Sequence, residues 1–144
     1  MKTPNLDFPE FDSNFKKCLY SKNSKTSIRR EMKDICKAIL GVDKEIRFVM
    51  ITDMQGNILC MKSTSKYMMP KELVEQMGGA WSAVLGGIFK QLAKYHGQFE
   101  YTIVKHQKVT TIGLGTEKNY AIFTVEKDVS EELIEKVKKV LMAK

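Results

Sequence analysis

The 144-residue sequence holds little of what catalytic and metal sites are built from, with two histidines and three cysteines. Cys18, Cys36 and Cys60 form no CxxC pair, which argues against a metal or redox site, so we expect reduced thiols that pack as small hydrophobic side chains. No cysteine or carboxylate stands at metal-ligand spacing beside His96 or His106. We weigh a metal site at these two histidines against structural roles, and we favour the structural roles.

Long apolar runs are also absent. No stretch approaches the roughly 18 uninterrupted apolar residues of a membrane-spanning helix. The first residues, MKTPNLDFPEF, have no apolar core and carry acidic residues early, unlike a secretory signal or a transit peptide. We therefore expect a cytoplasmic protein. With 43% hydrophobic and 28% charged residues, the composition is that of a globular chain with one core.

Catalytic motifs are missing as well, since the sequence contains no GxSxG, HExxH or GxxxxGK. The GlyLeuGly at 113–115 lies at a predicted strand end with no helix after it, so it lacks the context of a phosphate loop. Asp53, Gly56 and Asn57 resemble a nucleotide or calcium loop superficially, but these residue types are also typical of a hairpin turn, which we favour. We expect no enzymatic activity, no catalytic residue, no metal and no cofactor.

Charge is concentrated near the N-terminus. The formal net charge is +7, and residues 16–37 alone carry eight basic and two acidic residues, or +6. Clustered lysines and arginines can bind nucleic acid or an anionic membrane, but no aromatic platform or zinc finger accompanies them, so we favour a solvated arm. We expect residues 1–25 to be a flexible basic arm and 26–144 to be the folded domain. An acidic protein partner would contact Lys25, Arg29, Arg30 and Lys33.

Hydrophobic periodicity predicts eight elements. A first helix is expected over 28–40, with Thr26 or Ser27 as its N-cap. A second is expected over 70–96 and ends at Gly97. A third follows Asp128, which forms a capping box with Glu131. Strands are expected over 46–52, 58–63, 98–106, 109–115 and 120–126, and the first and last of these are apolar on both sides, as central strands are. The third strand alternates as an edge strand does, with Phe99, Tyr101 and Ile103 on one side. The order α-β-β-α-β-β-β-α predicts an α+β fold with a five-stranded antiparallel sheet between helices.

The long helix has two distinct sides. Nine large apolar residues share one broad side, which we expect to lie against the sheet: Leu73, Val74, Met77, Trp81, Val84, Leu85, Ile88, Leu92 and Tyr95. The opposite side is a stripe of small residues, namely Gly78, Gly79, Ser82, Ala83, Gly86 and Gly87. Each glycine inside a helix costs about 1 kcal/mol relative to alanine, so this stripe requires an explanation.

This element order, over residues 28–141, resembles the roadblock/LC7 (dynein light-chain type) domain, a relative of the longin and profilin-like folds. The IleArgPhe at 46–48, followed by Gly56, is similar to an uncharacterised archaeal family of this architecture. The resemblance implies a non-catalytic scaffold or regulator that forms a homodimer, with partners such as a small GTPase, a motor complex or a signalling assembly.

In such a dimer the long helix and the following edge strand meet their counterparts across a two-fold axis. The small stripe would let two helices approach closely, which gives a predicted interface of Gly78, Gly79, Ser82, Ala83, Gly86, Gly87, Phe99, Tyr101 and Ile103. Alternatively, the stripe faces solvent or a tight turn of the same chain. A second function stays open, a small-ligand sensor with a pocket between sheet and long helix, lined by Trp81, Met50, Met61, Phe89 and Tyr101.

Overall fold

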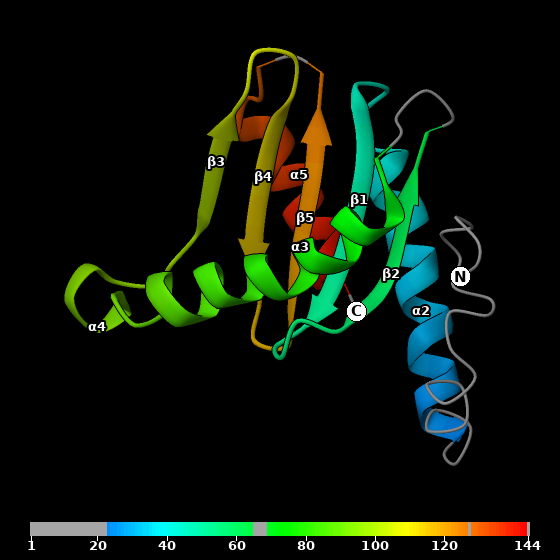
Figure 1. Ribbon diagram of the computed structural model, residues 1–144, viewed down its shortest axis with the longest axis horizontal. Helices are drawn as coiled ribbons and strands as arrows, with labels where there is room; N and C mark the ends of the chain where they lie inside the picture. Colours follow the sequence, from blue (N-terminus) through cyan, green and yellow to red (C-terminus); the bar gives the residue numbers. More distant parts are fainter. Residues whose placement is uncertain (1–22, 65–68, 127, 144) are drawn as a thin grey trace.

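An antiparallel sheet in the order β2-β1-β5-β4-β3 forms the centre of the structure (Figure 1). The computed structural model describes residues 23–64, 69–126 and 128–143. The strands are β1 (Ile46–Asp53), β2 (Ile58–Ser63), β3 (Tyr101–Lys105), β4 (Thr110–Gly115) and β5 (Asn119–Val125). The two strands that are apolar on both sides, β1 and β5, lie side by side inside the sheet, as predicted.

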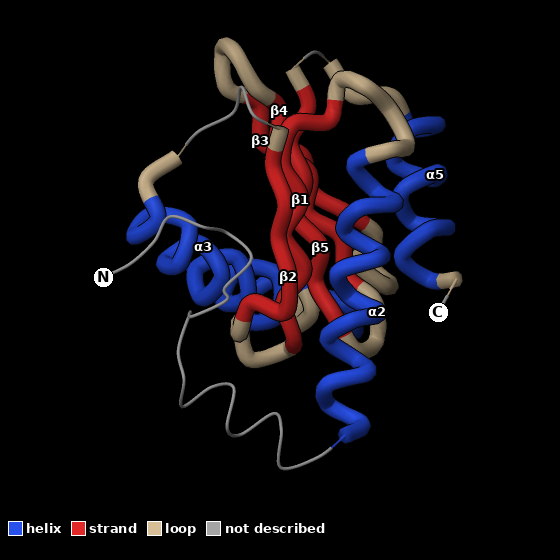
Figure 2. The backbone as a smooth tube through the Cα atoms, turned by 90° about the vertical axis from the view of Figure 1, so that its right-hand side faces the viewer, coloured by secondary structure: helices blue, strands red, loops and turns tan. Residues whose placement is uncertain are grey.

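Helices cover both faces of the sheet, seen edge-on in Figure 2. Helices α2 (Asn23–Leu40) and α5 (Glu131–Met142) lie on one face, and α3 (Lys71–Val84) lies on the other. Alternate residues of β1 therefore enter different cores: Val49 and Ile51 pack with α2 and α5 in a first cluster, while Phe48 and Met50 pack on the α3 side in a second cluster. The predicted α+β architecture is confirmed.

The starts of two helices differ from prediction. Helix α2 is already helical at Asn23, so Thr26 and Ser27 lie inside it and are not its N-cap. In α5 the cap is Ser130, whose hydroxyl accepts a hydrogen bond from the Leu133 N–H at 3.1 Å. Asp128 stands too early in the chain to cap this helix, and its carboxylate instead pairs with Lys105 of β3.

The predicted helix over 70–96 is interrupted. After α3 the chain makes a π-helical turn, η1 (Leu85–Phe89), and then a short helix α4 (Ala93–His96), which ends at Gly97 with φ of 92°. The hydroxyl of Tyr120 from β5 lies against Gly86, where a Cβ atom would collide with it. Gly86 therefore lies within the wider turn at the point where the segment packs most closely on β5.

Strand β3 is shorter than the predicted 98–106. Phe99 precedes the strand and stacks on Phe89 in the second cluster, with ring centroids 5.2 Å apart, whereas Tyr101 packs against the first cluster. The prediction that Phe99 and Tyr101 share one side is therefore wrong, because Phe99 lies outside the strand and does not follow its alternation. The bounds of β1, β4 and β5 differ from prediction by one residue at one or both ends.

Cys36 of α2 and Cys60 of β2 form a disulfide, with their Cα atoms 6.7 Å apart. The prediction of reduced thiols is wrong for this pair, although both side chains are buried as small apolar residues. Their separation of 24 residues in the sequence gave no indication of a disulfide. The pair forms because β2 returns beneath α2 after the hairpin. Cys18 lies outside the described residues.

Candidate interaction surface

The helical segment over 71–96 and the edge strand β3 leave many large apolar side chains uncovered. Of the eight large hydrophobic residues that are exposed in the described part of the chain, seven lie between 73 and 104. Five of them belong to the helical segment and are called here the outer face: Leu73, Val84, Ile88, Leu92 and Tyr95. The prediction that these five lie against the sheet is wrong. Val74 and Leu85 do lie against it, at 1% and 0% exposure.

The members of the outer face recur along the helical segment. Leu73 and Val84 are three helical turns apart on the same side of α3, and Ile88, Leu92 and Tyr95 follow at steps of three or four residues through η1 and α4. Figure 1 shows that α4 extends past β3 at the edge of the sheet. The outer face therefore runs from the middle of the sheet to its β3 edge and beyond it.

Three members of the predicted small-residue interface are covered by the chain itself. A Cβ atom at Gly78 would lie 2.8 Å from the carbonyl oxygen of Gly56, in the β1–β2 turn. Ser82 donates its hydroxyl hydrogen to the Met54 carbonyl oxygen of the same turn at 3.0 Å. Gly86 makes room for Tyr120. These small residues let the helix contact the turn and β5, so the prediction that they meet a second chain is wrong for Gly78, Ser82 and Gly86.

The other three small residues, Gly79, Ala83 and Gly87, point outward. All three are exposed, and a Cβ atom at Gly79 or Gly87 would meet nothing within 4 Å. They lie beside the exposed apolar side chains of the outer face. The six small residues therefore divide into three that pack against their own chain, Gly78, Ser82 and Gly86, and three that are exposed to solvent.

The edge strand β3 pairs only with β4 in the described chain, which leaves its other edge open. Ile103 and Val104 are 45% and 37% exposed on opposite faces of this strand. Tyr101 is half-buried and donates its hydroxyl hydrogen to Glu131 Oε2 at 3.2 Å, and this hydrogen bond raises the pKa of Tyr101. Of the predicted strand residues, Ile103 is thus exposed, while Phe99 and Tyr101 attach the strand to the two cores.

The basic residues predicted for an acidic partner fall at the start of the structure. Lys25, Arg29, Arg30 and Lys33 all lie within α2, so the helix includes Lys25, which the sequence placed in the arm. Lys33 is exposed and makes no ion pair with a described residue. The side chains of the other three, and residues 1–22, lie outside the described part of the chain.

The residues that were considered as a nucleotide, calcium or metal site have structural roles where the structure describes them. Asp53 accepts hydrogen bonds from the Gln55 N–H, the Asn57 N–H and the Asn57 side-chain amide at 2.9–3.0 Å, so its carboxylate organises the hairpin turn as predicted. Within residues 23–64, 69–126 and 128–143, no group of three His, Cys, Asp or Glu side chains could hold a metal ion. In the same residues, no helix is long and apolar enough to span a membrane.

No protein-family model matches the chain, and neither does any curated protein. Solved structures do match. MglB from Myxococcus xanthus has a TM-score of 0.63 at 12% identity, over 80% of this chain and 87% of that one. The gliding protein MglB from Thermus thermophilus has a TM-score of 0.62 at 13% identity, over 76% and 82%. A roadblock/LC7 domain from Streptomyces avermitilis has a TM-score of 0.55 at 7% identity, over 76% and 97%.

These identities are too low to carry a function, and they give no support to the suggested archaeal family. The TM-scores of 0.55–0.63 over 76–80% of this chain show a shared fold. The chain has the roadblock/LC7 fold.

Proposed function

We propose that this chain is a non-catalytic interaction module that forms a homodimer through the outer face and the open edge of β3. The observation that carries the proposal is the exposure of Leu73, Val84, Ile88, Leu92 and Tyr95 on one side of the helical segment. Large apolar side chains gathered on one exposed side favour a contact with another protein, because large contiguous apolar surfaces are rare on monomeric proteins.

A second copy fits this surface better than an unrelated partner. Gly79, Ala83 and Gly87 let another helix approach closely beside the apolar stripe, and the open edge of β3 offers unpaired backbone groups to a second β3. A two-fold axis brings both features together at once, because each chain supplies the same patch. The description of one MglB structure as having a tetrameric arrangement supports self-association of this chain.

We further propose that the dimer serves a protein partner, such as a small GTPase or a signalling assembly, as the roadblock resemblance implies. The basic residues of α2 would contact an acidic surface of that partner. Lys25, Arg29 and Lys33 are spaced four residues apart in α2 on the face of the sheet opposite α3, so this contact would leave the dimer surface undisturbed.

Light scattering after size exclusion tests the dimer. We expect the wild type to have twice the mass of one chain at micromolar concentration. Ile88→Asp places a charge at the centre of the outer face and should give a monomer, whereas Met142→Asp, at an equally exposed apolar residue of α5, should leave the dimer intact. A monomeric wild type would refute the proposal, and so would a dimer that survives Ile88→Asp.

The dependence of binding on salt concentration tests the proposed contact between α2 and an acidic partner. If α2 binds an acidic partner, affinity for that partner must fall steeply with ionic strength and must fall further in Lys33→Glu. A complex captured from native extract whose affinity does not change with salt would exclude the basic residues as its contact.

A further inference from the structure

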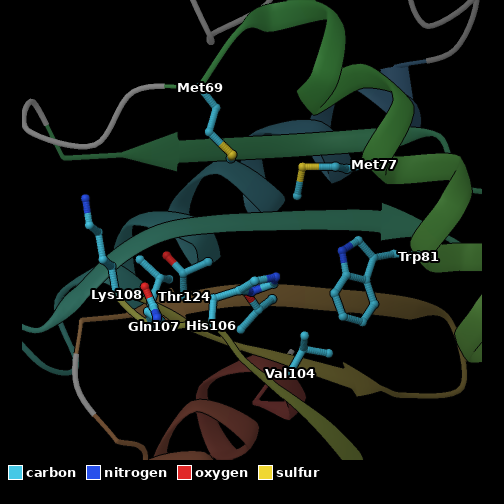
Figure 3. A pocket seen from close by; sticks show the side chains of 10 residues that line it. Met69, Met77, Trp81, Val104, His106, Gln107, Lys108 and Thr124 are labelled. Atoms are coloured by element: carbon cyan, nitrogen blue, oxygen red, sulfur yellow. The ribbon is translucent and has the colours of Figure 1, made fainter.

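A cavity of about 500 Å³ lies between α3 and the part of the sheet formed by β3, β4 and β5. In Figure 3, Met77 and Trp81 of α3 point into it from one side, and Thr124 and Val104 lie across from them. The volume falls within the range of small-molecule sites. Of the residues proposed above for a ligand pocket, Trp81 lines this cavity, whereas Met50 and Met61 are buried in the second cluster.

The hydroxyl of Thr124 is the first sign of a ligand. Thr124 is 2% exposed, and its Oγ1 atom has no hydrogen-bond partner. Buried hydroxyl groups in folded proteins nearly always have a partner, because an unpaired one has lost its water without replacement. Thr124 lines the cavity, so a molecule bound there could supply the missing partner.

The walls determine which kind of molecule fits. Met69, Met77 and Trp81 close the helical side, and Val104 lies on the sheet side. Methionine side chains adapt to the shape of a guest, and their sulfur atoms make favourable contacts with aromatic rings. The indole of Trp81 offers a flat surface for stacking. These walls favour a flat aromatic group.

The polar lining residues determine the charge. His106 and Lys108 of the β3–β4 turn line the cavity, and no acidic residue is among the described residues that line it. Lys108 forms no ion pair with any residue that the structure describes. Figure 3 shows Lys108 and Thr124 together at one end of the cavity, with Trp81 at the other. One end can therefore bind an anion while the other holds an apolar ring.

We propose that this cavity binds a small aromatic carboxylate. The carboxylate accepts hydrogen bonds from the Thr124 hydroxyl and the Lys108 ammonium group, and the ring lies between Trp81, Met77 and Val104. A carboxylate gives Thr124 the partner it lacks and gives Lys108 a counter-ion, which an uncharged aromatic molecule would not do. This site goes beyond the proposed self-association and does not depend on it.

Titration with 2-naphthoate tests the site, with 2-naphthalenemethanol as an uncharged ligand of the same shape. Trp81 is the only tryptophan of the chain, so its indole N–H gives one signal in a proton–nitrogen NMR spectrum. We expect naphthoate to shift that signal in a saturable manner, and calorimetry to give an affinity at least about 10-fold higher than for the alcohol, as for other hydrogen bonds to charged groups.

Variants locate the contacts. Lys108→Gln should weaken naphthoate binding about 10-fold, and Thr124→Val about 2- to 10-fold, while Thr124→Ser retains the hydroxyl and most of the affinity. Lys118→Gln, in the β4–β5 turn at the opposite end of β4, is the matched control and should change nothing. Thr124→Val loses only an unpaired hydroxyl, so it should fold.

Three results would overturn the proposal. In the first, the Trp81 signal does not move at millimolar naphthoate. In the second, naphthoate binds Lys108→Gln and Thr124→Val as tightly as the wild type. In the third, the signal moves with protein concentration and not with naphthoate, which would show that the cavity belongs to a contact between two copies.

Discussion

Gly78 and Gly79 are adjacent in the sequence and have opposite surroundings. A Cβ atom at Gly78 would lie 2.8 Å from the Gly56 carbonyl oxygen and 3.0 Å from Ile58 Cγ1, whereas one at Gly79 would meet nothing within 4 Å. Gly78→Ala must therefore displace backbone, and it should lower the free energy of unfolding by about 1–3 kcal/mol. Gly79→Ala should raise it by up to about 1 kcal/mol, because alanine favours the helix.

Urea denaturation of both variants checks this pair. The measurement is made at a protein concentration at which the chain is monomeric, so that only the stability of the fold is compared. If Gly78→Ala were as stable as Gly79→Ala, the close approach of α3 to the β1–β2 turn would be wrong.

The same glycines show why the sequence misassigned the two sides of the helix. Hydrophobicity predicts burial from side-chain size, but Gly78, Ser82 and Gly86 are covered because they are small enough to let a turn and Tyr120 come close. The large side chains at Val84 and Ile88 are then left outside. A contact that depends on a residue being small gives no hydrophobic signal, so no periodicity could have revealed it.

Tyr120 should make stability depend on pH in the alkaline range. Burial raises the pKa of its phenol above the ordinary value of 10.0. The folded chain therefore keeps a proton that the unfolded chain loses, and the free energy of unfolding should fall as pH rises from about 10 towards the higher pKa of the folded state. Tyr120→Phe should flatten this fall above about pH 10. The residual slope should belong to Tyr101, whose pKa is raised by Glu131.

At the scale of elements, the Cys36–Cys60 disulfide joins α2 to β2 and closes a loop of 24 residues. A loop of this length restricts the unfolded chain enough to contribute about 3 kcal/mol. Reduction should lower the free energy of unfolding by about this amount, measured by urea denaturation with and without a thiol reductant. Cys18→Ser should keep the full difference, whereas a difference that disappears in Cys18→Ser would assign the bond to another pair.

The sequence predicted the elements whose position follows from a local hydrophobic pattern. It did not predict the features that depend on contacts between residues far apart in the chain. The continuous apolar runs of β1 and β5 placed both strands inside the sheet, and they lie there. The π-helical turn at Leu85–Phe89 was missed because the helical spacing of apolar residues continues through it, and Tyr120, which packs on Gly86 in this turn, lies more than 30 residues further along the chain. The disulfide was missed for the same reason, because only the return of β2 beneath α2 brings its sulfur atoms together.

At the scale of the molecule, the element order was enough to predict three layers, because a sheet with two strands apolar on both sides must be covered on both faces. The candidate surface was predicted in part. The resemblance indicated the long helix and the β3 edge, and Gly79, Ala83, Gly87 and Ile103 are exposed there. The apolar stripe of the outer face was missed, because identifying it required knowing which side of the helix the β1–β2 turn occupies.

Self-association and folding should therefore be linked in a measurable way. A dimer that forms only from folded chains stabilises them by mass action, so the thermal midpoint should rise by roughly 2–4 °C for each tenfold increase in chain concentration. Ile88→Asp should remove this dependence and keep the midpoint that the wild type has at its lowest concentration, because Ile88 is 53% exposed and supports no core. Met142→Asp should behave as the wild type. If Ile88→Asp instead lowered the midpoint at every concentration, Ile88 would be part of the fold and the outer face would not be a surface for a second chain.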